Sequence, residues 1–349
     1  MSVKASVLGH FGGGETLLNG QTVKTKIITE ELQNQLGQGQ VLKIDTHGGA
    51  KTLVKAPLQV ISALKSGRNV LIFPAQNGLR VYAPLLSFFR HFFKGRKLHY
   101  VVIGGWLPQF LTKRKGLAKS LKNFDGIYVE TNTMKTALET QGFENVFVMP
   151  NCKKLTVLSE DELVYPDGVP YRLCTFSRVM REKGIEDAVN VVETVNRELG
   201  LTVFTLDIYG QADSAQIEWF DELQSKFPSY IRYAGLVPFD KSVDVLKEYF
   251  ALLFPTYYEG EGFAGTLIDA FSAGVPVIAS DWKYNTEIVN ENVGYVYKTR
   301  DHIALAELLK AVATDPTIML KKRRSCLREA EKYKIEKAVG VLLDRIEGD

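Results

Sequence analysis

The sequence is poor in cysteine and in long apolar runs. Three cysteines occur in 349 residues, at positions 152, 174 and 326, and their spacing matches neither a disulfide framework nor a metal site. Reduced, structural thiols are therefore expected, as in a cytoplasmic protein. No segment holds eighteen uncharged apolar residues, and the first residues lack the apolar region of a signal peptide. These absences argue against a disulfide scaffold, a membrane-spanning protein and a secreted protein.

Acidic residues are scarce in the first part of the chain. Residues 1–150 contain 19 Lys and Arg against 8 Asp and Glu, a net charge of +11. The remainder holds the other 24 of 43 basic and 32 of 40 acidic residues, a net charge of −8. Segregation on this scale predicts that the first half of the chain meets an anionic partner.

Short apolar runs alternate with amphipathic segments through most of the chain. This pattern is typical of doubly wound α/β domains, and the length predicts two of them. The mean hydropathy of −0.06 and the hydrophobic content of 45% are those of a soluble globular protein. Strands are predicted at 3–8, 41–44, 70–73, 100–103, 126–129, 146–149, 172–176, 204–209, 231–233, 252–254 and 275–278. Helices are predicted at 22–35, 57–64, 82–93, 133–140, 185–199, 215–226, 242–249, 266–273, 302–313 and 335–346.

The spacing of these segments becomes irregular near residues 150–170, where Pro, Asp and Gly accumulate. Domains are therefore predicted at 1–155 and 165–332, followed by a C-terminal helical segment at 333–349. Glycine-containing turns follow the first strand of each half, at 9–14 and 177–184. Ligands gather at the carboxyl ends of strands in open parallel sheets, so both turns are candidate ligand sites.

The stretch 255–289 holds two carboxylates, Glu261 and Asp269, with seven residues between them. Glycine-rich backbone surrounds the first carboxylate and leads into the helix at 266–273. A loop that runs into a helix start offers unpaired N–H groups and a positive dipole end, which suit a phosphate. With the phosphate between them, one carboxylate can reach a ribose hydroxyl and the other a sugar hydroxyl. This arrangement fits a nucleotide-sugar, although solvated acids on an ordinary loop–helix–strand unit give the same pattern.

Residues 261–280, EGFAGTLIDAFSAGVPVIAS, resemble the donor-site signature of retaining GT-B glycosyltransferases of the group 1 (family 4) type, EGFGxxxxEAxxxGxPVVAS. Asp269 stands where the family has Glu, and it is one methylene shorter. The resemblance implies the GT-B fold, two doubly wound parallel-sheet (Rossmann-like) domains that face a cleft. It further implies an acceptor on the N-terminal domain, a nucleotide-sugar on the C-terminal one, and a final helix that crosses back to the first domain.

The segment that contains Arg178 and Lys183, SRVMREKG, resembles the family segment whose Arg and Lys neutralise the donor diphosphate. Cations placed to fit the departing diphosphate lower the barrier to transfer. A solvated cluster at a helix start is the alternative interpretation. Arg178, Lys183 and Glu261 are therefore the predicted catalytic residues, with Glu261 orienting the donor sugar. The resemblance implies that these three residues and Asp269 bind the donor. It implies the same role for nine further residues: Gly12, Gly13, Gly210, Val237, Gly262, Phe263, Ala264, Gly265 and Thr266.

Many family members carry a His at the end of a central N-domain strand, and this sequence does not. The strand at 100–103 is followed by Gly104, Gly105 and Trp106. His10 and His47 are alternatives by position only, and a lone His in such a loop more often has a structural role. These two residues, with Asn19 and Trp106, are the acceptor-side candidates. Retaining enzymes of this type are thought to let the donor phosphate take the acceptor proton.

Two basic segments of the first half carry aromatic or apolar neighbours. Residues 88–97 interleave Phe with Lys and Arg, and residues 113–122 add a second group of cations. Such a composition suits docking on an anionic lipid surface. The alternative is that the phenylalanines form a core face with solvated cations opposite. The cations predicted to face a membrane are Lys94, Arg96, Lys97, Lys113, Arg114 and Lys115.

These observations predict a retaining glycosyltransferase that transfers a sugar from a nucleoside diphosphate to a saccharide acceptor. The acceptor is expected to be linked to a lipid, as in the synthesis of surface polysaccharides. The protein would be cytoplasmic and peripheral at the inner face of the cell membrane, and by family analogy would need neither a metal nor another cofactor. No Asp-x-Asp motif stands beside a suitable strand. A nucleotide-sugar epimerase and a non-catalytic partner that binds donor or lipid are the alternatives. A nucleic-acid binder lacks a recognisable recognition module.

Overall fold

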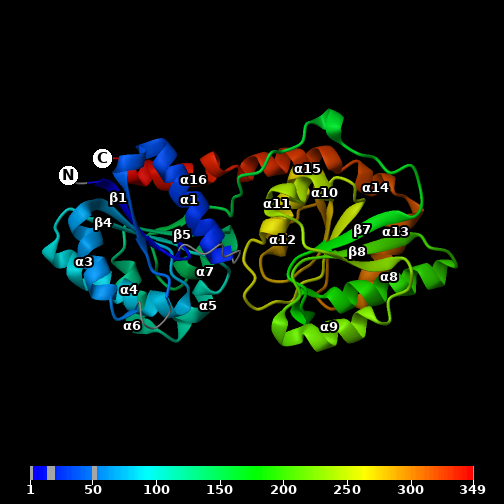
Figure 1. The fold of residues 1–349 in the computed structure, drawn as a ribbon, viewed down its shortest axis with the longest axis horizontal. Coiled ribbons are helices and arrows are strands. Elements are labelled where there is room, and N and C mark those ends of the chain that lie inside the picture. Colours follow the sequence, from blue (N-terminus) through cyan, green and yellow to red (C-terminus); the bar gives the residue numbers. More distant parts are fainter. Residues whose placement is uncertain (1–2, 14–19, 49–52, 349) are drawn as a thin grey trace. The chain divides into compact units, whose positions relative to one another are not determined.

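The fold is taken from a computed structural model, which describes residues 3–13, 20–48 and 53–348 (Figure 1). The chain divides into two compact units. Unit 1 comprises residues 1–154 together with 333–349, and unit 2 comprises residues 155–332. Each unit is built around its own parallel sheet of six strands.

The sheet of unit 1 has the strand order β2-β1-β3-β4-β5-β6. Its strands are β1 (Val3–Gly9), β2 (Val41–Asp45), β3 (Gly67–Ile72), β4 (Lys97–Val101), β5 (Gly126–Val129) and β6 (Val146–Val148). The helices of this unit are α1 (Gly20–Leu36), α3 (Ala56–Ser66), α4 (Gln76–Phe89), α5 (Leu107–Thr112), α6 (Lys115–Lys122), α7 (Asn132–Glu139) and α16 (Ile335–Glu347). The strand order reverses between β1 and β3, and open α/β sheets bind ligands outside the carboxyl ends of strands at such a switch point.

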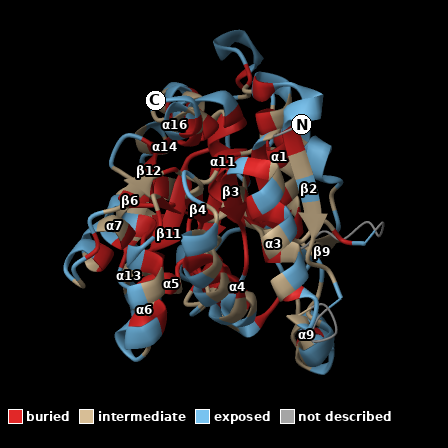
Figure 2. Cartoon of the chain, turned by 90° about the vertical axis from the view of Figure 1, so that its left-hand side faces the viewer, coloured by how far each residue is buried: buried red, intermediate tan, exposed pale blue. Residues whose placement is uncertain are grey.

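The core of unit 1 lies on both sides of this sheet. The strands β3 and β4 are buried, whereas α4 and α6 present their outer faces to solvent (Figure 2). On one side, Ile28 and Leu32 of α1 pack with Val339 and Leu342 of α16 in one apolar cluster. The C-terminal helix therefore completes the core of unit 1, although it is far from that unit's strands in sequence.

The sheet of unit 2 has the strand order β12-β11-β10-β7-β8-β9. Its strands are β7 (Tyr171–Phe176), β8 (Phe204–Tyr209), β9 (Ile231–Gly235), β10 (Ala251–Phe254), β11 (Val277–Ser280) and β12 (Gly294–Tyr297). The helices are α8 (Ile185–Leu199), α9 (Ile217–Gln224), α10 (Ser242–Leu246), α11 (Gly265–Ser272), α12 (Asn285–Ile288), α13 (His302–Thr314), α14 (Thr317–Leu320) and α15 (Arg323–Ala330). The order reverses between β7 and β10, which places this unit's switch point there.

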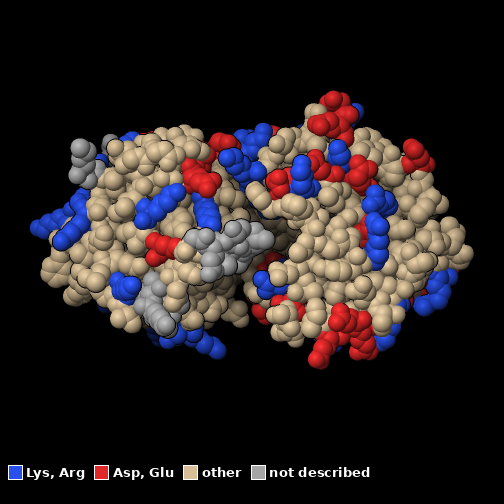
Figure 3. All heavy atoms as spheres, in the orientation of Figure 1, with Lys and Arg blue, Asp and Glu red and all other residues tan. Residues whose placement is uncertain are grey.

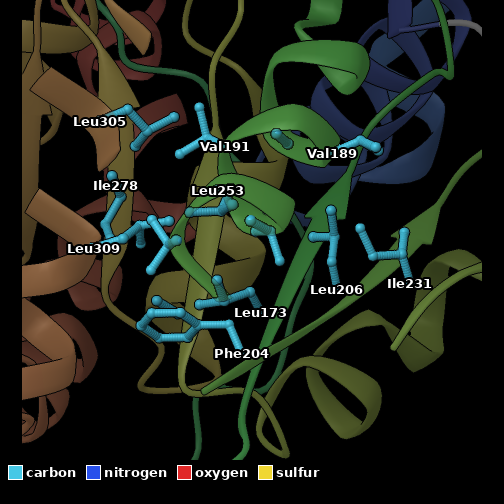
Figure 4. Close-up of a cluster of buried hydrophobic side chains, with 14 of the residues drawn as sticks. Leu173, Val189, Val191, Phe204, Leu206, Ile231, Leu253, Ile278, Leu305 and Leu309 are labelled. Atoms are coloured by element: carbon cyan, nitrogen blue, oxygen red, sulfur yellow. The ribbon is translucent and has the colours of Figure 1, made fainter. Parts of the chain in front are cut away.

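Strand and helix side chains interdigitate in the core of unit 2. Leu173, Leu206 and Leu253 project from three strands towards α8 and α13 (Figure 4). The buried residues of α8 recur at helical spacing, so one face of that helix covers the sheet. Leu305 and Leu309, one turn apart on α13, cover the neighbouring strands.

These sheets confirm the predicted fold class, while several boundaries differ from the sequence-based ones. The strand predicted at 275–278 begins at Val277, because Pro276 has no N–H and the N–H of Val275 donates to Ala270 at the end of α11. The short strand β12 and the helices α5, α6, α12, α14 and α15 were not predicted. No described helix is both long enough and apolar enough to span a membrane.

Candidate functional site

The carboxyl ends of β7 and β10 meet at the switch point of unit 2. The loop after β7 ends in the short 3-10 helix η4 (Arg181–Lys183) and then Gly184, whose φ is 71°. A Cβ on Gly184 would lie 2.2 Å from the carbonyl oxygen of Pro255, directly after β10. Both this contact and the left-handed backbone require glycine. Gly184 therefore lets the two loops touch and fixes Lys183 beside the loop that carries Glu261.

Lys183 and Glu261 form an ion pair at this point. The Lys183 Nζ lies 2.5 Å from Glu261 Oε2, and the two side chains are 12% and 8% exposed. The ammonium also lies 5.1 Å from the ring centroid of Tyr258 and 5.8 Å from that of Phe254. An ammonium has three N–H donors, and one of them meets Glu261. The pair thus places a largely buried ammonium group at the position where parallel sheets bind ligands. The Glu261 carboxylate balances the charge of this group.

Thr256 supports this pair and was not predicted from the sequence. Its hydroxyl donates to Glu261 Oε2 over 2.8 Å and accepts the N–H of Tyr258. Its carbonyl oxygen accepts the hydroxyl of Ser280, at the end of β11. Thr256 is fully buried, so these bonds fix the orientation of Glu261.

The loop after Glu261 leads into α11. Gly262 and Phe263 are buried, and Ala264, Gly265 and Thr266 are half-buried. Within the described chain no side chain caps the start of α11, and the buried Thr266 Oγ1 has no hydrogen-bond partner. Helix starts present amide donors and the positive end of the dipole, so this segment can receive an anion.

Asp269 lies in the second turn of α11 and is 2% exposed. The Ser242 hydroxyl, at the start of α10, donates to its Oδ1 over 3.1 Å. Asp269 thereby joins α11 to the segment that follows β9. Its assignment to the donor ribose stays a prediction. Replacing it with the family's Glu would add a methylene to a packed site, so this change is not conservative here.

Asp269→Asn tests that assignment. If Asp269 accepts a ribose hydroxyl, the neutral amide should weaken nucleoside-diphosphate binding by about tenfold, because its oxygen accepts a weaker hydrogen bond than the carboxylate does. Ser242→Ala is the matched control, since it removes the observed bond and leaves the carboxylate in place. The measurement is isothermal titration of each variant. An unchanged dissociation constant for a folded Asp269→Asn protein would remove Asp269 from the donor site.

The carboxyl ends of β8 and β9 hold two further predicted residues, Gly210 and Val237. Gly210 has a φ of 133°, and a Cβ there would lie 1.8 Å from the carbonyl oxygen of Ser177. This contact alone requires glycine at position 210, whatever else binds there. The Tyr233 hydroxyl donates to the Gly210 carbonyl over 2.8 Å, and the half-buried Val237 follows on an otherwise exposed loop.

Arg178 lies apart from the ion pair. Its side chain is 56% exposed, and its Nη1 lies 3.5 Å from Asp213 Oδ2. The structure therefore brings Lys183 and Glu261 into contact, while it pairs Arg178 with another carboxylate.

At the carboxyl ends of β1 and β2 in unit 1, His10 and His47 form a contiguous polar chain. The His10 Nδ1 lies 2.7 Å from Thr22 Oγ1, and its Nε2 lies 3.0 Å from His47 Nδ1. Burial, and then His47, lower the pKa of His10. Asp45 accepts the N–H groups of His47 and Gly13. The pairing of the two histidines was not predicted.

The other predicted residues of this region have varied surroundings. Gly12 and Gly13 both have left-handed backbone, with φ of 91° and 58°. Trp106 donates from Nε1 to the Ile103 carbonyl over 2.8 Å and is half-buried. Asn19 lies outside the residues that the structure describes.

A buried ion pair between Lys24 of α1 and Glu130, directly after β5, was also not predicted. The two charged atoms lie 2.5 Å apart, and the side chains are 5% and 3% exposed. Lys24 also donates to the Val102 carbonyl, after β4. This pair links α1 to the carboxyl ends of β4 and β5, and removal of one partner would leave the other charge buried without its counter-ion.

The predicted membrane-facing cations divide into two groups. Lys94, Lys113 and Lys115 are exposed. Arg96, Lys97 and Arg114 are half-buried; the Arg96 Nε donates to the Leu64 carbonyl, and the Arg114 guanidinium lies 3.7 Å from the Phe110 ring centroid. These three therefore contribute to the packing of unit 1.

Two of the four phenylalanines near α4 are exposed rather than part of the core. Phe88 and Phe92 are 59% and 70% exposed, with their ring centroids 5.7 Å apart. The interpretation of these residues as a core face is wrong for both of them. Phe89 and Phe93 are half-buried.

Comparisons with known proteins match both units. Residues 170–315 match the family model described as "Glycosyl transferases group 1". The GtfA subunit of a UDP-N-acetylglucosamine–peptide N-acetylglucosaminyltransferase from Streptococcus gordonii is 27% identical over 233 residues, which are 64% of this chain and 43% of that protein. The chain thus spans less than half the length of this curated relative.

Solved structures also match along the whole chain. HepE from Anabaena, solved in complex with UDP, is 14% identical, covers 100% of both chains and has a TM-score of 0.74. Sucrose-phosphate synthase from Thermosynechococcus elongatus is 15% identical, covers 98% of this chain and 97% of its own, and has a TM-score of 0.74. At these identities the likeness concerns the fold, and it agrees with the two-sheet GT-B architecture predicted from the sequence.

Proposed function

We propose that the protein transfers a sugar from a nucleoside diphosphate to an acceptor hydroxyl, since residues 170–315 match the family model described as "Glycosyl transferases group 1". The observation that carries the proposal is the Lys183–Glu261 ion pair, 2.5 Å long, at the switch point of unit 2. This is the position where a doubly wound sheet receives a nucleotide.

In this mechanism the donor diphosphate lies between Lys183 and the start of α11. The bond from the anomeric carbon to the diphosphate oxygen breaks, and a bond from that carbon to the acceptor oxygen forms on the same face. The acceptor proton passes to the departing diphosphate. Because the new bond forms on the face that the diphosphate leaves, the configuration at the anomeric carbon is retained. Lys183 and the amides of residues 262–266 stabilise the negative charge that develops. Glu261 orients the donor sugar and holds Lys183 in place.

We assign no metal to this reaction, because Lys183, Arg178 and the α11 dipole supply the positive charge. Arg178 is exposed on the same loop, and a rotation of its side chain would bring a second cation to the diphosphate. Transfer that proceeds unchanged in EDTA would support this assignment, and transfer that stops and is restored by a divalent cation would refute it.

Uridine diphosphate is our first choice of donor nucleotide. The GtfA relative is named for UDP-N-acetylglucosamine, and HepE was solved with UDP. We place the base near Gly210 and Val237 and the ribose near Asp269, since Ser242 joins Asp269 to the segment after β9. Parallel titration with UDP, GDP, ADP and dTDP tests the choice of base.

We place the acceptor on unit 1, where His10 and His47 lie at the carboxyl ends of β1 and β2. Between Asp45 and Asp125 the chain has fourteen Lys and Arg and no Asp or Glu. Lys and Arg side chains are spread over the visible face of unit 1, whereas acidic side chains gather over α9 of unit 2 (Figure 3). This charge supports an acceptor that is carried on an anionic membrane surface.

The helix α6 and the exposed phenylalanines form the docking surface in this proposal. Lys115, Lys119 and Lys122 project from α6 into a pocket of about 550 Å³. α4, which carries Phe88, packs against α6. Lysines bind lipid phosphates while phenylalanines enter the acyl region. The acceptor would then be a lipid-linked saccharide at the cytoplasmic face, and surface-polysaccharide assembly the pathway.

Replacing Lys115, Lys119 and Lys122 with Gln should weaken binding to phosphatidylglycerol vesicles by about 100-fold, because each cation near the surface contributes about 1 kcal/mol. Binding should also fall with salt, since exposed charges are screened within about 8 Å. The matched control is the triple Gln variant of the exposed Lys43, Lys55 and Lys65, which removes the same charge elsewhere on unit 1. Cosedimentation measures both. Equal binding to phosphatidylcholine vesicles, or equal losses in the two triple variants, would refute the docking surface.

A further inference from the structure

Among the described non-glycine residues, two have left-handed backbone: Lys283, with φ of 49°, and Arg300, with φ of 62°. They lie on neighbouring loops of unit 2, after β11 and β12. The Lys283 Nζ lies 5.9 Å from the ring centroid of Trp282, and the Arg300 guanidinium 5.0 Å from that of Tyr257. Such backbone is unfavourable for long side chains and is found most often where a site requires it. The coincidence of both residues at one place indicates a built site.

The loops after β7, β10, β11 and β12 line an open pocket of about 440 Å³. This volume falls within the range of small-molecule sites, about 300–1,000 Å³. Three aromatic rings, two carboxylates and a guanidinium line it: Tyr257, Tyr258, Trp282, Glu182, Glu259 and Arg300.

The walls of the pocket are held by hydrogen bonds. The Trp282 Nε1 donates to the Tyr258 carbonyl over 2.7 Å, and the Tyr257 N–H donates to the Glu182 carbonyl over 2.8 Å. The Lys283 ammonium lies 3.0 Å from Oε2 of Glu259, one of the lining carboxylates. The indole ring of Trp282 and the backbone of Tyr257 and Tyr258 are thus fixed before any ligand arrives, which reduces the entropy lost on binding.

This pocket lies apart from the predicted donor residues Gly210 and Val237, because its lining follows β7, β10, β11 and β12, whereas those two residues follow β8 and β9. Tyr258 lines the pocket and also contacts the Lys183–Glu261 ion pair, because the centroid of the Tyr258 ring lies 5.1 Å from Lys183 Nζ. The two lining carboxylates disfavour a phosphate or another anion. Flat aromatic faces match the C–H faces of a pyranose, and carboxylate and guanidinium groups bind neighbouring hydroxyls in pairs.

We propose that this pocket binds a sugar ring of a glycan, at a site distinct from the donor nucleotide site. Arg300 and Glu182 would bind ring hydroxyls, and Trp282 or Tyr257 would stack on the ring. Such a site would hold a saccharide chain against unit 2 whether or not the chain serves as the acceptor. The inference therefore does not depend on the proposed transfer.

Saturation-transfer NMR of the full chain with glucose, galactose, mannose and N-acetylglucosamine, each up to about 50 mM, tests the proposal, because it detects dissociation constants in the millimolar range. We expect saturable binding of at least one sugar and a matching change in tryptophan fluorescence.

The variants Arg300→Gly and Arg300→Asn test the role of the guanidinium, because glycine and asparagine both tolerate the left-handed backbone. Each should keep or raise the melting temperature while weakening sugar binding by about tenfold or more, through loss of the guanidinium hydrogen bonds. Arg197→Ala, at an exposed arginine of α8, is the control.

Absence of binding for all four sugars, or wild-type binding by both Arg300 variants, would overturn the proposal. A parallel UDP titration separates this outcome from the proposed transfer. Sugar binding without UDP binding would refute the donor site alone, and UDP binding without sugar binding would refute the glycan pocket alone.

Discussion

Lys183→Ala is expected to lower turnover by about 100- to 1,000-fold, which corresponds to about 2.7–4 kcal/mol of lost transition-state stabilisation. The reason is that Lys183 supplies the shielded positive charge at the switch point, 2.5 Å from Glu261. Its removal leaves the departing diphosphate without this cation and leaves the buried Glu261 carboxylate with the Thr256 hydroxyl but without its cationic partner. The measurement is the release of UDP from a UDP-sugar, with water or a saccharide as acceptor.

Lys298→Ala is the matched control for this change. Lys298 lies in the same unit and also pairs with a carboxylate, but its side chain is 76% exposed. Its loss should leave turnover unchanged, because exposed ion pairs contribute about 0–1 kcal/mol. Near-normal turnover in a folded Lys183→Ala protein would remove Lys183 from the reaction.

The second large effect is a loss of stability in acid, caused by His99 on β4. This ring is 1% exposed, and its Nε2 and Nδ1 lie 3.1 Å from Asn69 Oδ1 and 3.0 Å from the Tyr128 hydroxyl. The amide nitrogen of Asn69 donates to the Lys4 carbonyl, so its oxygen faces His99 and Nε2 carries the proton of the neutral ring. Burial lowers the pKa of His99 to about 4.

The sign of the effect follows from proton uptake. Between pH 6.5 and 4 the unfolded chain binds a proton at His99 that the folded chain does not, so the free energy of unfolding falls as the pH falls. The shift of the pKa from 6.5 to about 4 corresponds to about 3 kcal/mol of the free energy of unfolding. This contribution is fully present above pH 6.5 and is lost as the pH falls to 4. His99→Gln should flatten the pH dependence of unfolding in urea. His91→Gln, at an exposed histidine, should leave it unchanged. The same acid dependence in wild type and His99→Gln would contradict this role.

The sequence predicted the parts of this protein that repeat local patterns. Apolar runs located eleven of the strands, because a buried parallel strand is a short continuous hydrophobic segment. The run 261–280 and the Lys183 segment indicated the family, and the structure brings Lys183 and Glu261 into contact. These motifs are local because a βα loop carries its ligand-binding groups within a few residues.

The contacts that join distant segments could not be predicted in this way. Thr256 resembles any residue after a strand until its hydroxyl is seen to meet Glu261. Lys24 and Glu130 are 106 positions apart, and Ser242 and Asp269 are 27 apart. Gly210 illustrates a different difficulty, because a residue assigned to ligand binding from the sequence can be required by packing alone. Its conformation and its contact with Ser177 both require glycine. Such pairings depend on strand order, which periodicity does not specify.

The most direct test of the account is thermal unfolding of wild type and Lys183→Ala with UDP, GDP, ADP and dTDP. At about a hundred times its dissociation constant, the nucleotide of the donor should add about 2.7 kcal/mol to the free energy of unfolding. We predict this stabilisation for UDP in the wild type and its loss in Lys183→Ala. Stabilisation by none of the four nucleotides, or equal stabilisation of both proteins, would contradict a donor site at the Lys183–Glu261 pair.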